Sequence, residues 1–298
     1  MLIRIGSRGS ALALWQAEHV KERLEALGHA VEVRVITTTG DRILDRPLES
    51  VGGKGAFLKE IEEAMLVGEV DLAVHSLKDV PTSLPDGLAL CAILERGDPR
   101  DALVSRSGTR LVELPSGARV GTASLRRQAQ LRARRPDLAV VDLRGNVDTR
   151  IRRLREGRFD AILLALAGLM RLGRAAEATE ALDPDLMVPA PGQGAIGLEC
   201  REGDRGVSEA VILLNHEVTA RAVAAERAFL ARLGGGCNVP LAAYAVADGE
   251  GLRLQGLVAG LDGSRVVRGE ARGSEPQSLG CGLAERLLAE GAGELIEP

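Results

Sequence analysis

Apolar and polar positions alternate in two distinct ways along the first 200 residues. Short runs rich in Val, Ile and Leu have the pattern of strands; they are Ile3–Gly6, Val31–Ile36, Asp71–Val74, Leu88–Leu94, Arg119–Gly121, Leu138–Leu143, Asp160–Leu164 and Ile196–Cys200. Apolar residues recur at helical spacing in the segments between them, namely Ser10–Leu27, Ala56–Val67, Ser124–Arg134 and Val147–Glu156. Strands that alternate with helices predict an α/β fold with mainly parallel sheets.

The last third of the chain has a different pattern. It predicts a helix over Glu217–Leu233, strands near 241–247, 252–259 and 265–271, and a closing helix near 276–290, which is typical of a small α+β domain. Before it, the turn Pro189–Ala195 returns the chain to the first domain. The predicted domains are α/β domain 1 (1–95 plus 195–215), α/β domain 2 (96–194) and α+β domain 3 (216–298).

The two α/β domains contain a similar strand, hydroxylated turn and helix start, at Arg4–Ser10 and at Arg119–Leu125. Free N–H groups and the positive end of the helix dipole attract an anion at such a place. Ligands of open α/β sheets bind at the carboxyl ends of the strands. We therefore expect the two domains to flank an anion-binding cleft. The polar, Gly-rich segment Thr37–Gly55 is predicted to be a functional loop.

Charge is concentrated in one segment. The chain carries a net charge of −4, yet residues 119–158 contain 12 arginines and four acids, so they carry +8 and the rest of the chain −12. This favours a small polyanionic ligand. Aromatic residues make up only 2%, which argues against a single-stranded nucleic-acid binder built on stacked bases. Only four lysines are present, and Lys54 and Lys78 are candidates for sites that need a compact ammonium group.

Composition sets further limits. The 298 residues are 45% hydrophobic and 27% charged, as in ordinary globular proteins, and no apolar run is long enough to span a membrane. The N-terminus lacks a signal-peptide pattern, so we expect a cytoplasmic protein, a monomer without nucleic-acid or membrane partners. Cys91, Cys200, Cys237 and Cys281 have no metal-ligand spacing, so no metal is expected. In a reducing compartment disulfides are not expected either, and Cys91, Cys200 and Cys281 are predicted to be buried free thiols.

Three places carry candidate chemistry. Cys237 follows three glycines and precedes Asn238 and Pro240, so its sulfur lies on a bare loop that a bulky group can approach. Asp79 beside Lys78 can stay ionised and stabilise a cation or pass a proton, although an aspartate shortly before a proline is also common in plain turns. Paired cations at two helix starts can bind carboxylates bidentately, or can belong to a solvated helix face; they are Arg126, Arg127, Arg144 and Arg150.

Two other functions stay open from these residues. One is a two-lobed anion-binding protein that performs no chemistry. Such a protein does not need a cysteine on a glycine-rich loop of a third domain. The other is a Cys–His hydrolase. It is poorly supported because neither His75 nor His216 has a recognisable nucleophile context, and a glycine loop supplies no helix dipole to activate the thiol.

The motifs resemble, in order and over nearly the whole chain, those of the porphobilinogen deaminase (hydroxymethylbilane synthase) family. They are Ile5–Ser10, Val51–Gly55, His75–Pro81, Gly121–Arg127, Leu143–Val147, Gly192–Ala195 and Gly235–Cys237. Each motif alone is weak, but their joint occurrence is specific. Ser50 stands where some members carry a lysine, which is a small departure from the family pattern.

The resemblance implies two periplasmic-binding-protein-like domains and a third domain that carries a dipyrromethane cofactor on Cys237 through a thioether. It implies a transferase that adds four porphobilinogen molecules head to tail, releases ammonia and finally hydrolyses off hydroxymethylbilane. Asp79 matches the catalytic carboxylate.

Further matched residues fall into three groups. The cofactor-binding matches are Ser76, Lys78, Thr122, Ser124, Arg126, Arg127, Arg144 and Gly145. The substrate-binding matches are Arg8, Ser10, Arg144, Arg150, Arg171 and Gln193. Lys54 and Phe57 match a lid.

Overall fold

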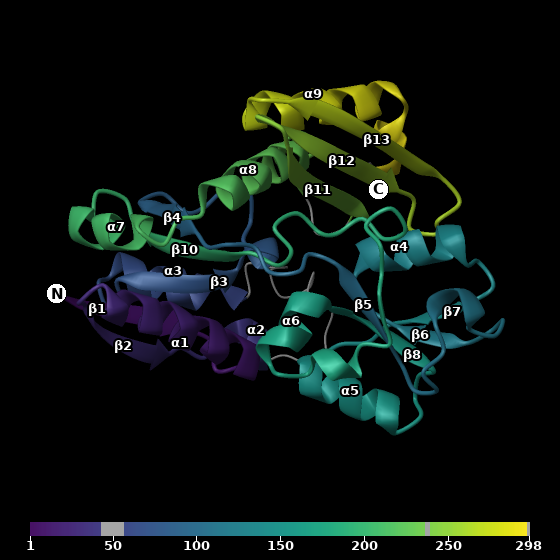
Figure 1. Ribbon diagram of the computed structural model, residues 1–298, viewed down its shortest axis with the longest axis horizontal. Coiled ribbons are helices and arrows are strands. Elements are labelled where there is room, and N and C mark those ends of the chain that lie inside the picture. Colours follow the sequence, from purple (N-terminus) through teal and green to yellow (C-terminus); the bar gives the residue numbers. More distant parts are fainter. Residues whose placement is uncertain (43–56, 236–238, 297–298) are drawn as a thin grey trace. The chain divides into compact units, whose positions relative to one another are not determined.

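A computed structural model of the 298-residue chain describes residues 1–42, 57–235 and 239–296. The chain divides into two compact units, 1–97 with 195–221 and 98–194 with 222–298 (Figure 1). The second unit contains both predicted domain 2 and nearly all of predicted domain 3, so the division into three domains stays a prediction. No helix in the described ranges is long and apolar enough to cross a membrane.

The first unit is built on a five-stranded sheet in the order β2-β1-β3-β10-β4. Its strands are β1 (Leu2–Ser7), β2 (Ala30–Val35), β3 (Leu72–Ser76), β4 (Leu88–Ile93) and β10 (Ile196–Arg201). The first three run parallel, and β10 is antiparallel to both of its neighbours. Helices α1 (Ala11–Ala26) and α7 (Arg205–Ile212) pack on one face, and α3 (Lys59–Leu66) packs on the other.

The second unit contains a sheet of the same pattern, in the order β7-β6-β8-β5-β9. Its strands are β5 (Asp101–Ser105), β6 (Arg119–Gly121), β7 (Ala139–Val141), β8 (Ala161–Ala165) and β9 (Glu180–Ala181). Here β6, β7 and β8 run parallel while β5 is antiparallel to β8. Helix α4 (Leu125–Arg134) packs on one face, and α5 (Val147–Arg155) and α6 (Leu166–Arg171) on the other. The predicted likeness of the two α/β parts is thus confirmed at the level of topology.

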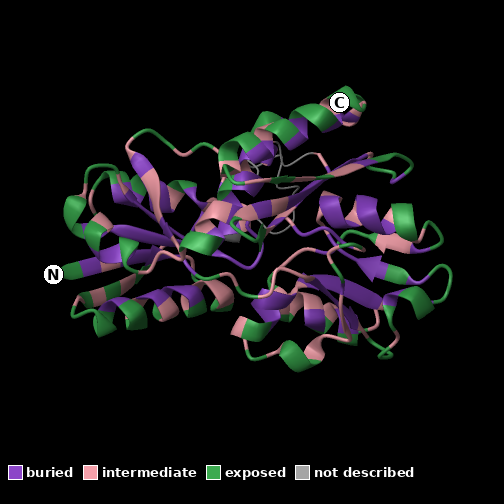
Figure 2. Cartoon of the chain, turned by 45° about the horizontal axis from the view of Figure 1, so that its top comes forward, coloured by how far each residue is buried: buried purple, intermediate pink, exposed green. Residues whose placement is uncertain are grey.

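The C-terminal part is a three-stranded antiparallel sheet with helices. It comprises α8 (Glu217–Arg232), β11 (Leu241–Asp248), β12 (Gly251–Ala259), β13 (Val266–Gly273) and α9 (Pro276–Ala289). One face of this sheet forms a core with α8 and α9 around Phe229 and Leu283. The other face packs on α4, where Ala129 meets Leu257 and Ala259. Figure 2 shows the helices with buried residues on one side and exposed residues on the other, so the predicted α/β class with a small α+β part is confirmed.

Short elements complete the described chain. They are α2 (Thr39–Arg42) and the 3₁₀ turns η3 (Leu77–Asp79), η4 (Leu111–Glu113), η5 (Ala175–Glu177) and η6 (Ala292–Leu295). The segment Thr37–Gly55 was expected to be a loop, but it begins with the short helix α2. The later part of that segment lies outside the described residues. The predicted strand Asp71–Val74 is observed to continue to Ser76, and η3 follows at once.

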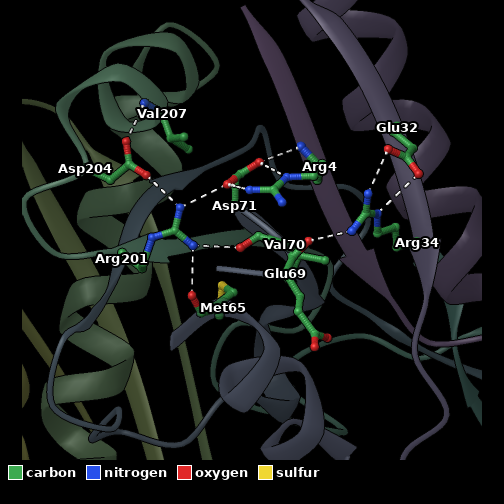
Figure 3. Close-up of polar contacts among 10 residues, drawn as sticks. All are labelled: Arg4, Glu32, Arg34, Met65, Glu69, Val70, Asp71, Arg201, Asp204 and Val207. Carbon is green, nitrogen blue, oxygen red and sulfur yellow. Dashed lines mark hydrogen bonds and ion pairs between the residues drawn. The ribbon is translucent and has the colours of Figure 1, made fainter. Parts of the chain in front are cut away.

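An ion network joins three strands of the first unit at the amino end of β3. Asp71 accepts hydrogen bonds from Arg4 Nε at 2.8 Å and Nη2 at 2.7 Å, and from Arg201 Nη2 at 2.9 Å (Figure 3). Arg201 also binds Asp204 at the start of α7. Burial alone raises the pKa of Asp71, but these hydrogen bonds prevail and lower it to about 2. The network ties β1, β3 and β10 together.

The expectation that all three accessory cysteines are free thiols is wrong for two of them. Cys91 on β4 and Cys200 on β10 form a disulfide, and only Cys281 is a free thiol among the cysteines that the structure describes, where it is partly exposed rather than buried as predicted. The two strands are antiparallel neighbours with a register shift at Leu198/Glu199. This pairing brings the two Cα atoms to 6.2 Å, within the range that a disulfide requires.

Candidate active site

In the first unit, predicted site residues gather at the carboxyl ends of β1 and β3. Because these strands are parallel neighbours, the residues after β1 (Arg8, Ser10) and after β3 (Lys78, Asp79) lie at the same edge of the sheet. Ser10 caps α1 by accepting a hydrogen bond from the Ala13 amide at 3.3 Å. The half-buried Asp79 is held by the single turn η3, so its carboxylate stays partly accessible.

Two further polar contacts order this edge. Ser76 Oγ accepts a hydrogen bond from Gln16 Nε2 at 2.8 Å, which joins β3 to α1. The buried His75 lies 2.9 Å from Glu199 Oε2 through its Nε2 atom, as expected for a hydrogen-bonded core histidine. The guanidinium of Arg8 lies over the Phe57 ring, 4.1 Å from its centroid. Phe57 therefore contacts a predicted substrate-binding residue, whereas Lys54 lies outside the described residues.

In the second unit, predicted site residues follow the parallel strands β6, β7 and β8. Thr122 and Ser124 follow β6. The Thr122 Oγ1 atom accepts a hydrogen bond from the Ser124 amide at 3.2 Å, just before α4 begins. Arg144 and Gly145 follow β7 and precede the N-terminus of α5. Gly145 has φ +109°, and a Cβ there would lie 2.9 Å from Thr149 Cγ2, so the turn requires glycine.

The arginines after β7 and β8 donate hydrogen bonds to the turn after β7 and to the segment that precedes β10. Arg150 Nε donates to the Gly145 carbonyl at 2.7 Å, and Arg144 Nε donates to Asp142 at 3.0 Å. Arg171, at the end of α6, donates to the Gly194 carbonyl at 2.6 Å. Burial lowers the pKa of Arg171 to about 10, so it stays cationic near neutral pH.

Arg126 and Arg127 are nearly fully buried and share one carboxylate, that of Asp101 at the start of β5. Asp101 accepts from Arg126 Nη1 at 2.7 Å, from Arg127 Nη2 at 2.7 Å, and from Gln193 Nε2 at 2.9 Å. Burial alone raises the pKa of Asp101, but the two arginine charges hold it far below its usual range. Three predicted residues thus converge on a fourth that the sequence reasoning missed. The available signal was an aspartate that opens an apolar run, Asp101–Val104.

Cys237 lies outside the described residues, and only the chain before it can be placed. Gly234 and Gly235 have φ values of +82° and +54°, and their amides donate to Ala231 and Leu230 at the end of α8. These left-handed conformations suit glycine. The buried Glu226 anchors helix α8. Its carboxylate accepts hydrogen bonds from the Gly192 amide at 2.7 Å and from the Ala245 amide at 2.8 Å. Glu226 was also missed from the sequence.

Comparisons with known proteins agree on one family. The model for the porphobilinogen deaminase dipyromethane cofactor binding domain matches residues 3–209, and the model for the porphobilinogen deaminase C-terminal domain matches residues 220–289. Porphobilinogen deaminase from Geobacter metallireducens is 55% identical over 298 residues, covering 99% of this chain and 93% of the relative. The enzyme of that name from Pelobacter propionicus is 56% identical over 299 residues, covering 99% and 96%.

Solved structures give weaker matches. The Bordetella pertussis BvgS periplasmic VFT2 domain has a TM-score of 0.42 at 15% identity, over 70% of this chain and 85% of that one. A periplasmic substrate-binding protein of an ABC transporter from Coxiella burnetii has a TM-score of 0.42 at 16% identity, over 70% and 90%.

Proposed function

The chain belongs to the porphobilinogen deaminase family, and we propose that it joins four porphobilinogen molecules head to tail with release of ammonia. In this proposal the growing chain is carried by a dipyrromethane cofactor on Cys237, and hydroxymethylbilane is released by hydrolysis. The observation that carries the proposal is the match of the cofactor-binding-domain model to residues 3–209, which contain a buried arginine pair at a helix start.

The residues of the second unit fit such a cofactor chemically. Each porphobilinogen carries an acetate and a propionate, so the cofactor presents several carboxylates. Arg126 Nε is buried and has no hydrogen-bond partner among the described residues, which marks a place for an acceptor. The helix starts of α4 and α5 add free amides and a favourable dipole. The cofactor, when bound, supplies the nucleophilic pyrrole carbon to which the first substrate is added.

Individual side chains have separable roles in the proposal. Cys237 anchors the cofactor as a thioether. Arg126, Arg144 and Lys78 bind its carboxylates as fixed cations. Asp79, on the short turn η3, stabilises positive charge on the reacting ring and moves a proton as ammonia leaves. Arg8 and Arg171 neutralise carboxylates of the incoming substrate.

The test is the intact mass of protein purified from a host that makes porphobilinogen. We expect a mass increase of two pyrrole units, located on the peptide that contains Cys237. Cys237→Ser is expected to show no increase. Asp79→Asn is expected to fold and to carry the added mass but to lose turnover by a factor of about 10² or more. An unmodified mass in the wild type would contradict the proposed function. Near-normal turnover in Asp79→Asn would contradict the catalytic role of that residue.

We also propose that the enzyme acts as a monomer in the cytoplasm. The absence of a membrane-spanning helix among the described residues is compatible with this location. The Cys91–Cys200 disulfide is unusual for a reducing compartment, so a cytoplasmic enzyme must keep this bond out of reach of cellular thiols. Cys200 is fully buried but Cys91 is partly exposed, so the fold shields only one of the two cysteines.

A further inference from the structure

Three titratable side chains that the proposed reaction does not use are buried together in the first unit. His75 lies on β3, Glu199 on β10 and Glu62 on α3, and each is less than a tenth exposed. Glu199 is paired with Ala73, and Ala73 belongs to the core under α3. Opposed residues of antiparallel strands face the same side of a sheet, as do residues two apart on one strand. Glu199 and His75 therefore both point toward α3.

This cluster has fewer hydrogen-bond donors than its acceptors need. His75 Nε2 lies 2.9 Å from Glu199 Oε2. The other oxygen, Glu199 Oε1, is buried with no hydrogen-bond partner among the residues that the structure describes, and the same holds for Glu62 Oε1. A buried carboxylate oxygen without a donor is costly. Since a carboxylate only accepts whereas a protonated carboxyl group also donates, one added proton can serve both acids.

The electrostatics of the cluster place that proton on Glu62. Burial raises the pKa of Glu62, and the negative charge of Glu199 raises it further. His75 acts in the opposite direction, and Glu63, which pairs with Lys59 on the exposed side of α3, adds a smaller increase. Like charges that meet in a buried site favour a state in which one of the two groups is protonated.

Charged groups nearer the amino end of β3 are already paired with one another. Asp71 binds Arg4 and Arg201 (Figure 3), and Arg201 Nη1 also donates to the Met65 carbonyl at 2.8 Å, which fixes the end of α3. Strand β4 contributes no charged side chain. Glu62 lies about one turn before Met65 and forms no ion pair within the described chain. It is therefore left to be neutralised by a proton rather than by a cation.

The same cluster supports the turn that carries Asp79. Strand β3 ends one residue after His75, and η3 follows directly. The Leu77 amide, at the start of η3, donates to the Ala195 carbonyl at 3.1 Å just before β10. Gly197 lies opposite His75 on β10, and a Cβ there would lie 2.7 Å from Leu77 Cδ1. The position of η3 thus depends on how β10 lies beside β3, which is where the contact between His75 and Glu199 is formed.

We propose that Glu62 keeps its proton in the active enzyme and donates it to Glu199 Oε1. The resulting chain of contacts, from α3 through Glu199 to His75, holds β3 against β10 and so positions Asp79. Glu62, Glu199 and His75 are then positioning residues that do not touch substrate or cofactor. The link to Asp79 rests on the proposed function, whereas the proton on Glu62 can be measured without it.

Infrared spectroscopy tests the proton directly. Wild type and Glu62→Gln are compared as purified at pH 7, so that all other carboxyl groups cancel in the difference spectrum. We expect this spectrum to contain the C=O stretching band of a protonated carboxyl group. The difference between wild type and Glu63→Gln, the exposed neighbour, is expected to contain the bands of an ionised carboxylate instead. Carboxylate bands in the Glu62→Gln difference spectrum overturn the inference.

Steady-state turnover of porphobilinogen tests the positioning role. Glu62→Gln replaces the proton-bearing oxygen with an amide that also donates, so kcat at pH 7 is expected to stay within about twofold of wild type. Glu62→Leu fills a similar space but donates nothing. Its kcat is expected to fall about tenfold or more with little change in KM, because a displaced catalytic group slows the chemical step. Glu63→Gln is the matched control and should resemble wild type.

The pH dependence of kcat separates donation from packing. A group whose pKa is raised by folding contributes stability at low pH and loses it as the pH rises through the folded-state value. Wild type is therefore expected to lose kcat at lower pH on the alkaline side than Glu62→Gln, whose amide does not titrate. Identical alkaline limbs for these two proteins, or equal kcat for Glu62→Gln and a folded Glu62→Leu, overturn the inference. A wild type that does not consume porphobilinogen overturns the proposed function itself, and the infrared result then decides on the proton alone.

Discussion

At the scale of single residues, buried carboxylates organise the arginines of this chain. Asp71 joins Arg4 to Arg201 in the first unit, and Asp101 joins Arg126 to Arg127 in the second. In each case one acid holds two cations, which come from two strands in the first unit and from adjacent positions of one helix in the second. Removing Asp101 leaves two buried cations without a counter-charge, which costs more than the loss of one surface ion pair, whereas removing Asp71 still leaves Arg201 with Asp204.

This predicts an acid-dependent contribution from Asp71. Its pKa is lowered from 3.8 to about 2, so its stabilisation is fully present above about pH 4 and is lost as the pH falls through about 2. Asp71→Asn is expected to lower the melting temperature by several degrees at pH 7, and the gap to wild type should close between pH 4 and pH 2. Thermal unfolding followed by circular dichroism across this range measures it.

The control is Glu32→Gln, which breaks the exposed Arg34–Glu32 pair and is expected to change the melting temperature little. A gap between wild type and Asp71→Asn that stays constant from pH 7 to pH 2 would contradict the assigned pKa.

At the scale of elements, β4 and β10 are antiparallel neighbours on either side of the long segment 98–194. The chain leaves the first unit after β4 and returns to it just before β10. The Cys91–Cys200 disulfide spans a sequence separation of 109 residues between these strands. It therefore restricts the unfolded chain over the whole of residues 98–194, and a cross-link over so long a loop stabilises strongly in the chain-entropy model.

We expect reduction of this bond to lower the free energy of unfolding by about 2–4 kcal/mol. Denaturant unfolding of the wild type with and without a thiol reductant measures the effect. Cys91→Ser and Cys200→Ser should match the reduced wild type and be insensitive to reductant, while Cys281→Ser should behave as wild type because Cys281 is free. An oxidised wild type that unfolds at the same denaturant concentration as the reduced one would disprove this.

At the scale of the second unit as a whole, α4 is shared between two sheets. One side of α4 packs on the sheet that contains β5 to β9 through Leu131, and the other packs Ala129 against β12. The turn between β12 and β13 approaches the same helix, and Arg132 Nη1 donates to the Leu261 carbonyl at 2.5 Å. The helix that carries the arginine pair is thereby fixed from both sides.

Gly263 in that turn tests the contact. Its φ is +74°, and a Cβ there would lie 2.6 Å from the Ala133 amide and 2.8 Å from the Ala129 carbonyl. Gly263→Ala is expected to push the C-terminal sheet off α4, so calorimetry should show a lower melting temperature and a second transition. Gly249→Ala is the matched control, because its φ is +60° but nothing lies within 4 Å of the added Cβ. Equal effects of the two substitutions would show that only backbone strain matters.

The prediction of elements succeeded where periodicity was strong and failed where it was interrupted. Helices α1, α4 and α5 were predicted close to their observed bounds, and α4 and α5 carry their apolar residues on one side. Strand β5 was missed because it opens on a charged residue, Asp101, whose burial depends on Arg126 and Arg127 far along the chain. Helix α6 was missed because its apolar residues continue directly from β8.

The sequence by itself determined the α/β class, the basic segment, and the candidate residues, because periodicity, charge and local motifs are properties of neighbouring positions. Only the tertiary structure decided how those residues are used. Strand register brought Cys91 to Cys200, and the antiparallel entry of β5 placed one buried carboxylate between two arginines of α4. The physical reason is that a buried charge takes its partner from whatever the fold brings near, so adjacent Arg126 and Arg127 contact different backbone carbonyls while they share one carboxylate.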